Sequence, residues 1–514
     1  MALFGGGKPD HPMADIKKAK SLIADLPASD SVKTVEEVTY WLDSITREEG
    51  FKVDYRFQLI DALDQAAKNH PRRLAQDYLA TDRQEKFRES KLWNASNEFW
   101  KTLGNAYIHC IEQFQAGASG SGGVKKEIPV MIARALRTLT LQIKWGLLRY
   151  GPLDDHVWSD IGRLFLFAEA QNVSTQNIAN YPGQHGGGTI AQEFLKALML
   201  SVSSTDGLAP LRQEIAERVI AHFGSAFVLQ PAPGAGCSFY FDLAMRKPAA
   251  RAMSRTESAE TMRFFGAGGA LAGLLQMAET IRAQNAIPSG INLGATYEPE
   301  LVLSVMQHLA MYWSDKPPAR SSERRKTATR MTVVHGFKET YASVDPCELD
   351  NSLDFHQDKS SESWIVENVS EGGFGAIVPQ VKGDWLRVGC LLGLQTETSQ
   401  YWGAGVIRRI SRDEFQQRRI GIQVLSKSVI PVTLTPAGNV SSFNAARGGE
   451  PGVLLSTSPD KNGEISLLLR EGSYSPRQAL DMSVRGRNFY LMPSRLVEGG
   501  EDFDLACFKV MQRE

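Results

Sequence analysis

Basic residues gather between positions 320 and 330 of a 514-residue chain whose formal net charge is only −1. Five cations and the single carboxylate of Glu323 leave a local charge of +4: Arg320, Arg324, Arg325, Lys326 and Arg330. A guanidinium group presents a planar fork of N–H donors that fits two phosphate oxygens at once. The cluster therefore predicts an anion contact, although a solvated linker has the same composition.

Asn368, Ser370 and Gly373 form a second polar group in the stretch NVSEGG, which precedes the apolar run FGAIVP. Short polar side chains can donate and accept hydrogen bonds, and glycines permit a positive φ that turns backbone N–H groups toward a ligand. The tripeptide NVS also begins at Asn172 and Asn439, but neither copy has the later glycine. An ordinary Asx-type turn is the alternative interpretation.

Helical spacing of apolar residues extends from about residue 13 to residue 315. Val35, Val38, Leu42 and Ile45 recur at intervals of three and four residues, and PVMIARALRTLTLQIKWGLLRY follows the same rule from its first-turn proline. GASGSGG at 117–123 is a flexible linker by composition, which would separate two lobes or join two long helices. Residues 225–250 predict a short hairpin within the helical region.

The composition changes near residue 316, where KPPARSSERRKTATR combines prolines, small polar residues and positive charge. Short runs rich in Val, Ile, Trp and Phe follow, separated by Gly, Asp and Ser. They predict an antiparallel sheet or small barrel, and similar runs after residue 430 predict a second β unit or an extension of the first. We expect a helical domain at 1–315, a barrel at 316–430 and a C-terminal β unit at 431–514.

Motifs of common enzyme and metal sites are missing. FFGAGGALAG at 264–273 lacks the third glycine of a dinucleotide fingerprint, so close helix packing by small residues is the preferred interpretation. There is no Walker loop, HExxH or GxSxG, and no histidine pair has helical metal-site spacing. We predict no catalytic residues, no metal and no cofactor, but a site assembled from distant residues within 1–315 stays an alternative.

Cysteine usage and charge limit the compartment and the partners. The five cysteines are odd in number and never form a CxxC pair, which favours a reducing compartment. No run approaches the ~20 apolar residues that a membrane span requires. We therefore expect a cytoplasmic protein without a membrane span, and the near-neutral balance gives no reason to expect nucleic acid as a partner.

The two polar groups together resemble the PilZ family of bacterial cyclic di-GMP receptors. That family has an RxxxR loop entering the first strand of a six-stranded barrel and a [D/N]xSxxG motif after a later strand. Here ERRKTATR leads into MTVVHGF, NVSEGG leads into FGAIVP, and YWGAGVIRRI with RRIGIQVLS is similar to the later strand pair. The resemblance covers about residues 318–428, and we identify no family for the helical region.

The resemblance implies a ligand and a role for each motif. Arginine-loop residues would bind the phosphates and guanines of cyclic di-GMP, with Asn368, Ser370 and Gly373 on the other side. The implied basic contacts are Arg324, Arg325, Lys326 and Arg330. Arg325 and Arg330 are five positions apart where the family has four, whereas Lys326 and Arg330 keep the family spacing.

Two functions follow from this comparison. The chain would be an effector, not an enzyme, in which cyclic di-GMP alters how the helical region faces the barrel or a protein partner. The alternative is a scaffold whose barrel binds no nucleotide. An unidentified protein partner is expected in either case, self-association is compatible with both, and the sequence does not specify the downstream output.

Overall fold

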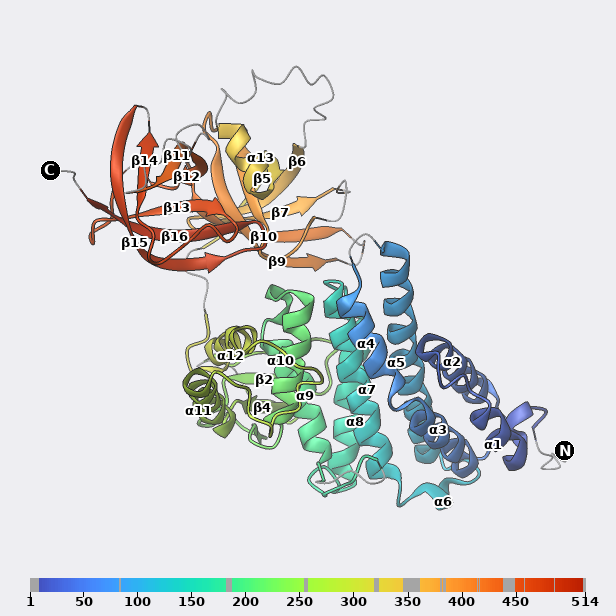
Figure 1. Cartoon of the computed structure of the whole chain (residues 1–514). Coiled ribbons are helices and arrows are strands. Elements are labelled where there is room, and N and C mark those ends of the chain that lie inside the picture. Colours follow the sequence, from blue (N-terminus) through green and yellow to red (C-terminus); the bar gives the residue numbers. More distant parts are fainter. Residues whose placement is uncertain are drawn as a thin grey trace. The chain divides into compact units, whose positions relative to one another are not determined.

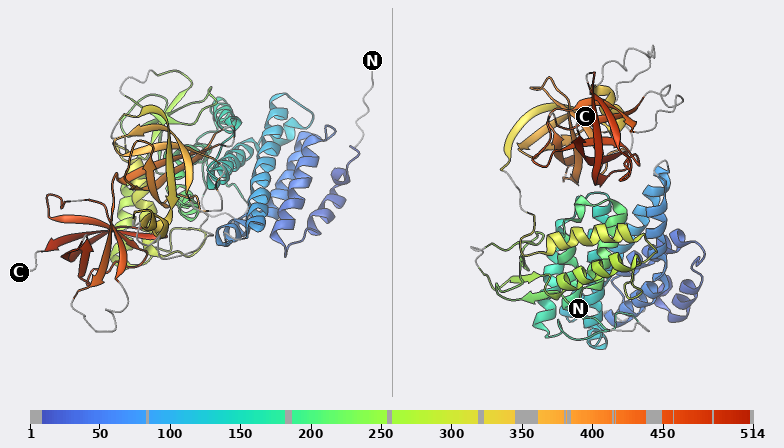
Figure 2. Two further views of the ribbon diagram at one scale, coloured as in Figure 1. Left: turned by 90° about the horizontal axis from the view of Figure 1, so that it is seen from above. Right: turned by 60° about the vertical axis from the view of Figure 1, so that its left-hand side comes forward.

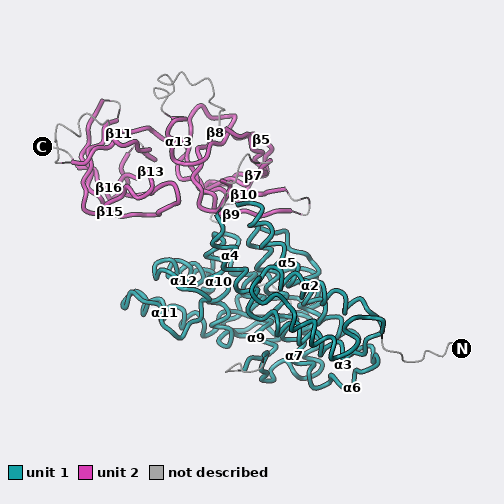
Figure 3. The backbone as a smooth tube through the Cα atoms, turned by 45° about the vertical axis from the view of Figure 1, so that its right-hand side comes forward, with its two compact units in different colours: residues 1–319 teal, residues 320–514 magenta. Residues whose placement is uncertain are grey.

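The computed structural model places the chain in two compact units, residues 1–319 and residues 320–514 (Figure 3). The described residues are 9–82, 85–181, 187–253, 258–318, 323–344, 361–379, 381, 385–413, 415, 417–437, 449–456, 458–484 and 486–511. Within them the predicted order of a helical region followed by two β units is confirmed (Figure 1). The domain boundaries at 315 and 430 stay a prediction.

The first unit is built mainly from helices that pack side by side around one apolar core. Aspartates cap the N-termini of α2 and α8, and Thr189 forms a capping box with Gln192 at the start of α9. The helices are α1 (Ile16–Ala24), α2 (Ser31–Arg47), α3 (Val53–Ala67), α4 (His70–Ala80), α5 (Lys86–Gln115), α6 (Ser121–Val124), α7 (Ile128–Leu148), α8 (Asp155–Ala170), α9 (Ile190–Val202), α10 (Pro210–His222), α11 (Gly269–Gln284) and α12 (Pro299–Trp313), with short 3-10 turns at Pro12–Ala14 and Thr205–Gly207.

Helices α5 and α7 run through the middle of this unit, and the predicted stripe of α7 is buried. The connection between them, where we expect a flexible linker, contains the short helix α6 and contacts α3. The backbone N–H of Val53 donates to the carbonyl of Ser119, and Gly120 and Gly123 lie against the side chain of Asp54. Residues 1–319 thus form one compact unit around this connection.

A four-stranded antiparallel sheet interrupts the helices between α10 and α11. Its strands are β1 (Val228–Gln230), β2 (Phe239–Asp242), β3 (Ala250–Arg251) and β4 (Met262–Gly266), in the order β1-β4-β2-β3. The predicted hairpin at 225–250 is therefore wrong in its pairing, because β4 lies between β1 and β2. The glycine-rich stretch 264–273 is also not a helix throughout, since it ends β4 and reaches α11 through Gly268 at φ 51°.

Two closed six-stranded barrels make up the second unit, seen in orange and red in Figure 2. The first has the order β10-β7-β6-β5-β8-β9 and the second the order β11-β12-β13-β16-β15-β14, so the C-terminal segment is a barrel of its own. The first contains β5 (Arg325–His335), β6 (Glu362–Ser370), β7 (Gly373–Val378), β8 (Leu391–Thr396), β9 (Gly403–Arg412) and β10 (Arg418–Ser426), with α13 (Gly336–Val344) after β5. The second contains β11 (Ile430–Pro436), β12 (Glu450–Leu454), β13 (Glu464–Arg470), β14 (Leu480–Val484), β15 (Arg487–Gly499) and β16 (Phe503–Met511).

The two barrels share an apolar cluster that includes Phe337 and Tyr341 of α13, Val406 of β9 and Phe503 of β16. Ion pairs between the barrels accompany this cluster. The guanidinium of Arg408 binds the carboxylate of Glu498 through two contacts of 2.6 and 2.5 Å, and Arg387 pairs with Glu501. Because a bidentate pair fixes an orientation as well as a distance, these contacts set how the barrels meet.

Asp502, in the turn between β15 and β16, lies against the start of α13. Its carboxylate accepts backbone hydrogen bonds from Leu391 and Phe337, and Oδ2 lies 3.2 Å from the position that a Cβ on Gly336 would take. Its Oδ1 is buried without a hydrogen-bond partner among the described residues. Burial, which outweighs the backbone hydrogen bonds, raises the pKa of Asp502 to about 6.

The Asp502→Asn variant should respond to pH differently from the wild type. A folded-state pKa above the unfolded value means that the folded protein binds more protons, so its stability falls as the pH rises from about 4 to about 6. Asparagine removes this loss, and solvent screening limits the gain to about 1 kcal/mol above pH 7. Thermal melts from pH 4.5 to 7.5 should show a Tm difference that grows in favour of the variant. A difference that stays constant with pH would contradict this assignment.

The hairpin between β6 and β7 turns through only Glu371 and Gly372. The hydroxyl of Ser370 donates to the carbonyl of Gly373 across this turn at 3.2 Å. A Cβ on Gly373 would collide with the backbone carbonyl oxygen of Ile422 in β10, whereas a Cβ on Gly372 would meet nothing within 4 Å. The two adjacent glycines therefore have different roles, and only Gly373 is required by space.

Alanine at each position separates these roles. Gly373→Ala should lower the free energy of unfolding of the barrel unit by about 1 to 3 kcal/mol, the usual cost of overpacking, because backbone on β10 must move. Gly372→Ala is the matched control and should be neutral or slightly stabilising, since its φ is outside the left-handed region. Urea denaturation followed by tryptophan fluorescence measures both. Equal effects of the two substitutions would refute the steric argument.

Candidate ligand-binding site

Strand β5 begins at Arg325, so most of the predicted arginine loop is part of the sheet. The expectation that the strand starts near Met331 is wrong in extent, because residues 325–330 already pair with β6. Arg324 precedes the strand and is exposed, and Arg320 lies outside the described residues. The basic side chains are thus attached to a strand with a defined register.

A bulge between Lys326 and Thr329 shifts the pairing of β5 with β6. Lys326 lies opposite Asn368, and after the bulge Arg330 lies opposite Ile365. Four positions along β5 therefore correspond to three along β6. Bulges change the direction of side chains at the edge of a sheet, and here the bulge brings Lys326 and Arg330 closer together along the barrel.

Asn368 lies on the outer face of the barrel. Its partner on β7 is Gly375, which precedes the buried, inward-facing Ala376 by one residue and therefore faces outward. A Cβ on Gly375 would lie 2.5 Å from Oδ1 of Asn368, so the amide occupies the space that a side chain would fill. Oδ1 is buried and accepts no hydrogen bond from the described residues.

Lys326 shares the outer face with Asn368, because directly opposite residues of an antiparallel pair project to the same side. Arg330 also faces outward, since its partner Ile365 is 49% exposed. Arg325 lies opposite Val369 and so projects to the other side, at the exposed beginning of the strand. The structure therefore brings Lys326, Arg330 and Asn368 together on one face, with Arg325 at its edge.

Ser370 ends β6 and Gly373 begins β7, so the two residues flank the hairpin turn at this end of the barrel. The expectation that the glycines turn N–H groups outward through a positive φ is wrong, because neither Gly372 nor Gly373 has a φ in that region. Gly373 instead allows β10 to approach β7, where it pairs with Gln423. Both residues thus hold the turn beside Asn368.

The described residues do not neutralise the positive charges at this face. Arg325, Lys326 and Arg330 are exposed, and none of the three side chains forms an ion pair with a described residue. The nearby carboxylate of Glu367 is 3.4 Å from Arg419 of β10, which balances its charge. The face consequently has an excess of positive charge and can attract an anion.

One feature of the site could not be taken from the motif alone. Gly375 makes room for the Asn368 amide on this face, and its only sequence signal is its place two residues after Gly373 on the same strand face. Among the described residues no group of three His, Cys, Asp or Glu side chains could hold a metal ion. No helix of that part of the chain is both long and apolar enough to cross a bilayer.

Comparison with protein families supports the barrel assignment and extends it to the helices. Residues 17–233 match the model of the N-terminal domain of the cyclic-di-GMP receptor FimW, and residues 345–431 match its middle PilZ domain. No curated protein matches the chain. The helical region, for which the sequence indicated no family, is thus similar to a domain of the same receptor. The predicted resemblance is confirmed: the first barrel of this chain belongs to the PilZ family, within the cyclic-di-GMP receptor group represented by FimW.

Proposed function

We propose that the chain is a cytoplasmic effector, without catalytic activity, that binds cyclic di-GMP on the outer face of the first barrel. The observation that supports this most directly is the register that sets Lys326 beside Asn368 and Arg330 on one face. The match to the PilZ domain of a cyclic-di-GMP receptor supports cyclic di-GMP as the ligand. Ser370 and Gly373 would shape the turn, and Arg324 and Arg325 would contact the ligand from the edge.

The chemistry of the face fits the ligand. Cyclic di-GMP has two phosphates, which the cationic side chains of Lys326 and Arg330 would bind, and two guanines with N–H donors. The unpaired Oδ1 of Asn368 offers an acceptor for such a donor, and a buried acceptor without a partner favours any ligand that supplies one. Glycines 375 and 421 lie opposite each other on this face, so β7 and β10 place no side chain between Asn368 and Arg409.

Substitutions on this face should weaken cyclic di-GMP binding. A charge-assisted hydrogen bond contributes about 1.5 to 3 kcal/mol, so Arg330→Ala should raise the Kd by about 10- to 150-fold in calorimetric titrations of the full chain. Arg325→Ala should raise it less, because its side chain projects from the edge. Lys326→Arg should retain or strengthen binding, since it restores an arginine pair at the family spacing.

Arg470→Ala is the matched control, because Arg470 is an exposed arginine on the second barrel. Its Kd should stay within about twofold of the wild type. If the wild type gives no heat at tens of micromolar, or if Arg330→Ala and Arg325→Ala both bind as the wild type does, the alternative is correct. The barrel is then a scaffold, and partner capture should not require the basic residues.

We further propose that ligand binding changes the orientation of the helical unit or its access to a protein partner. The cations occupy the first residues of the barrel unit, immediately after the connection to residues 1–319. A ligand bound there contacts the segment through which the units are joined, and ordering of such a segment is a common switch.

Small-angle scattering of the full chain tests this mechanism. Saturating cyclic di-GMP should change the radius of gyration of the wild type, and the change should vanish in the Arg330→Ala variant. An unchanged scattering curve at demonstrated saturation would reject the orientation change while leaving ligand binding in place.

A further inference from the structure

A cavity of about 460 Å³ lies within the helical unit. Residues of α3, α4, α5, α7, α9 and α10 line it, together with the segment at Asn180 and Tyr181. Its volume is within the range of about 300 to 1,000 Å³ that is typical of small-molecule sites. The wall is rich in charged side chains, which is unusual for a space inside a helical core.

Two cations of α7, Arg137 and Lys144, line this cavity, and Arg134 lies one turn before them. Their spacings of three and seven residues place them on one stripe. A buried cation normally requires a partner, because removing its charge from water costs several kcal/mol. The partners of the three residues therefore decide what the cavity can bind.

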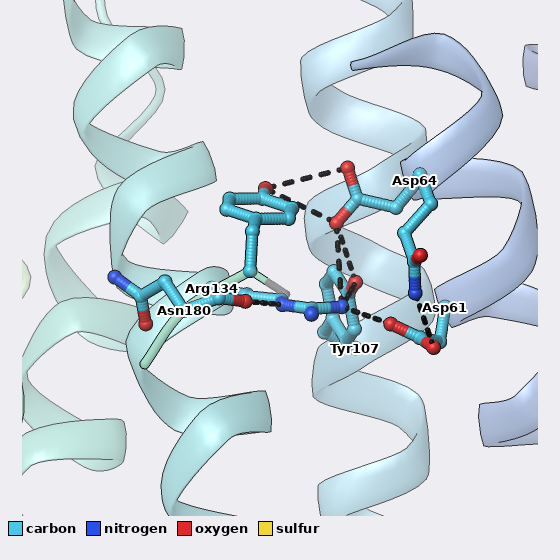
Figure 4. Close-up of polar contacts among 7 residues, drawn as sticks. Asp61, Asp64, Tyr107, Arg134 and Asn180 are labelled. Carbon is cyan, nitrogen blue, oxygen red and sulfur yellow. Dashed lines mark hydrogen bonds and ion pairs between the residues drawn. The ribbon is translucent and has the colours of Figure 1, made fainter. Parts of the chain in front are cut away.

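Arg134 is fully engaged, as Figure 4 shows. Its guanidinium donates to Oδ1 of Asp61 at 2.6 Å, to the Tyr107 hydroxyl at 2.9 Å and to the carbonyl of Asn180 at 2.8 Å. Asp64 is 3.6 Å away and accepts a hydrogen bond of 2.6 Å from Tyr107. Burial raises the pKa of Asp64, against the opposing effect of these contacts.

Lys144, seven residues after Arg137, is also neutralised. Its ammonium group is 2.5 Å from Glu214 and 3.3 Å from Glu217, and its side chain is only 3% exposed. Arg218 contacts the same two carboxylates at 3.2 and 3.6 Å. Both flanking cations of the stripe thus have carboxylate partners within the protein.

Arg137 forms no ion pair with the residues that the structure describes, although the carboxylates of Glu193, Asp64 and Glu217 attract it from beyond ion-pair distance. Its guanidinium lies over the ring of Tyr181 at 5.0 Å, and the ammonium of Lys68 approaches the same ring at 5.3 Å, also without an ion pair from the described residues. Burial raises the pKa of Tyr181 to about 12, so its hydroxyl stays protonated and donates to Asp64. Tyr181 therefore does not neutralise either cation.

The cavity wall as a whole has surplus positive charge. Six cations line it: Lys68, Arg72, Arg137, Lys144, Lys196 and Arg218. Three carboxylates line it, Asp64, Glu193 and Glu217, which leaves +3. Glu214, which pairs with Lys144 outside the wall, lowers this surplus to +2.

Asn180 supplies an independent polar group on the same wall. It is only 7% exposed, its Nδ2 donates to Glu193 at 3.3 Å, and its Oδ1 is buried without a partner among the described residues. Glu193 accepts only, which fixes the nitrogen on that side of the amide. The free oxygen can therefore accept a hydrogen bond from a hydroxyl or amino group in the cavity.

We propose that this cavity binds a small organic phosphomonoester, with its phosphate between Arg137 and Lys68 and its polar remainder toward Asn180. A phosphomonoester carries a charge of about −1.5 to −2 at pH 7, which matches the surplus of the wall. The guanidinium fork of Arg137 suits two phosphate oxygens. The volume accommodates more than the phosphate group alone.

Calorimetric titration of the full chain tests the site with GMP, glucose 6-phosphate, inorganic phosphate and citrate as probes. At least one of the two monoesters should bind more tightly than inorganic phosphate and citrate. The monoester with the lower Kd shows which organic group the cavity prefers beside the phosphate. Arg137→Gln should raise its Kd by at least about 10-fold. Lys68→Gln, at an exposed position that folding tolerates, should raise it by about 2- to 5-fold.

Arg163→Gln is the matched control, since Arg163 is an exposed arginine of α8 outside the cavity, and it should leave the Kd unchanged. The proposal is overturned if neither monoester binds, if citrate binds as tightly as the better monoester, or if Arg137→Gln and Lys68→Gln have no effect. It is also overturned if binding disappears in Arg330→Ala instead, which would assign the anion to the barrel. Cyclic di-GMP titrated separately into the Arg137→Gln variant should bind as it does to the wild type. The cavity proposal and the barrel proposal can therefore be rejected independently of each other.

Discussion

The close approach of β7 and β10 at Gly373 is the constraint on which the candidate barrel site depends. The carbonyl of Ile422 occupies the space where a side chain would begin, so the two strands can pair only if residue 373 has no Cβ. That pairing closes the barrel and fixes the turn that holds Ser370 and Asn368. A position that contacts no ligand atom can therefore be as necessary for recognition as one that does.

The sequence predicts the elements of this molecule better than their pairing. Apolar periodicity locates α2 and α7 because their buried residues recur at helical spacing. Short β-rich runs locate both barrels. The start of β5 is missed, since a strand with one solvated face can be charged, and the residues from Arg325 to Arg330 have the composition of a linker. The bulge beside Lys326 has no sequence signal, because register depends on the neighbouring strand.

The buried charges of the helical unit show the same limit. Arg134 and Lys144 belong to a helix that its apolar stripe predicts, but their carboxylate partners Asp61 and Glu217 are each 73 residues away. A pattern confined to one helix contains no information about such partners. Arg137 cannot be distinguished from Arg134 and Lys144 by sequence, and only the packing of α3, α9 and α10 shows that, of these three cations, Arg137 forms no ion pair with a described residue.

The chain has a net charge of −1, yet positive charge exceeds negative charge in two of its regions. The two regions differ in how well water hydrates their cations. On β5 water hydrates Lys326 and Arg330, so the absence of a carboxylate costs the folded state little, and salt screens their attraction for an anion. Inside the helical unit Arg137 has lost much of its hydration, and screening is weaker. The free-energy cost of removing this cation from water must be offset by apolar burial elsewhere, by a bound water or by a bound anion. The helical core therefore has a stronger physical requirement for a counter-charge than the barrel surface, although only the barrel carries a sequence motif.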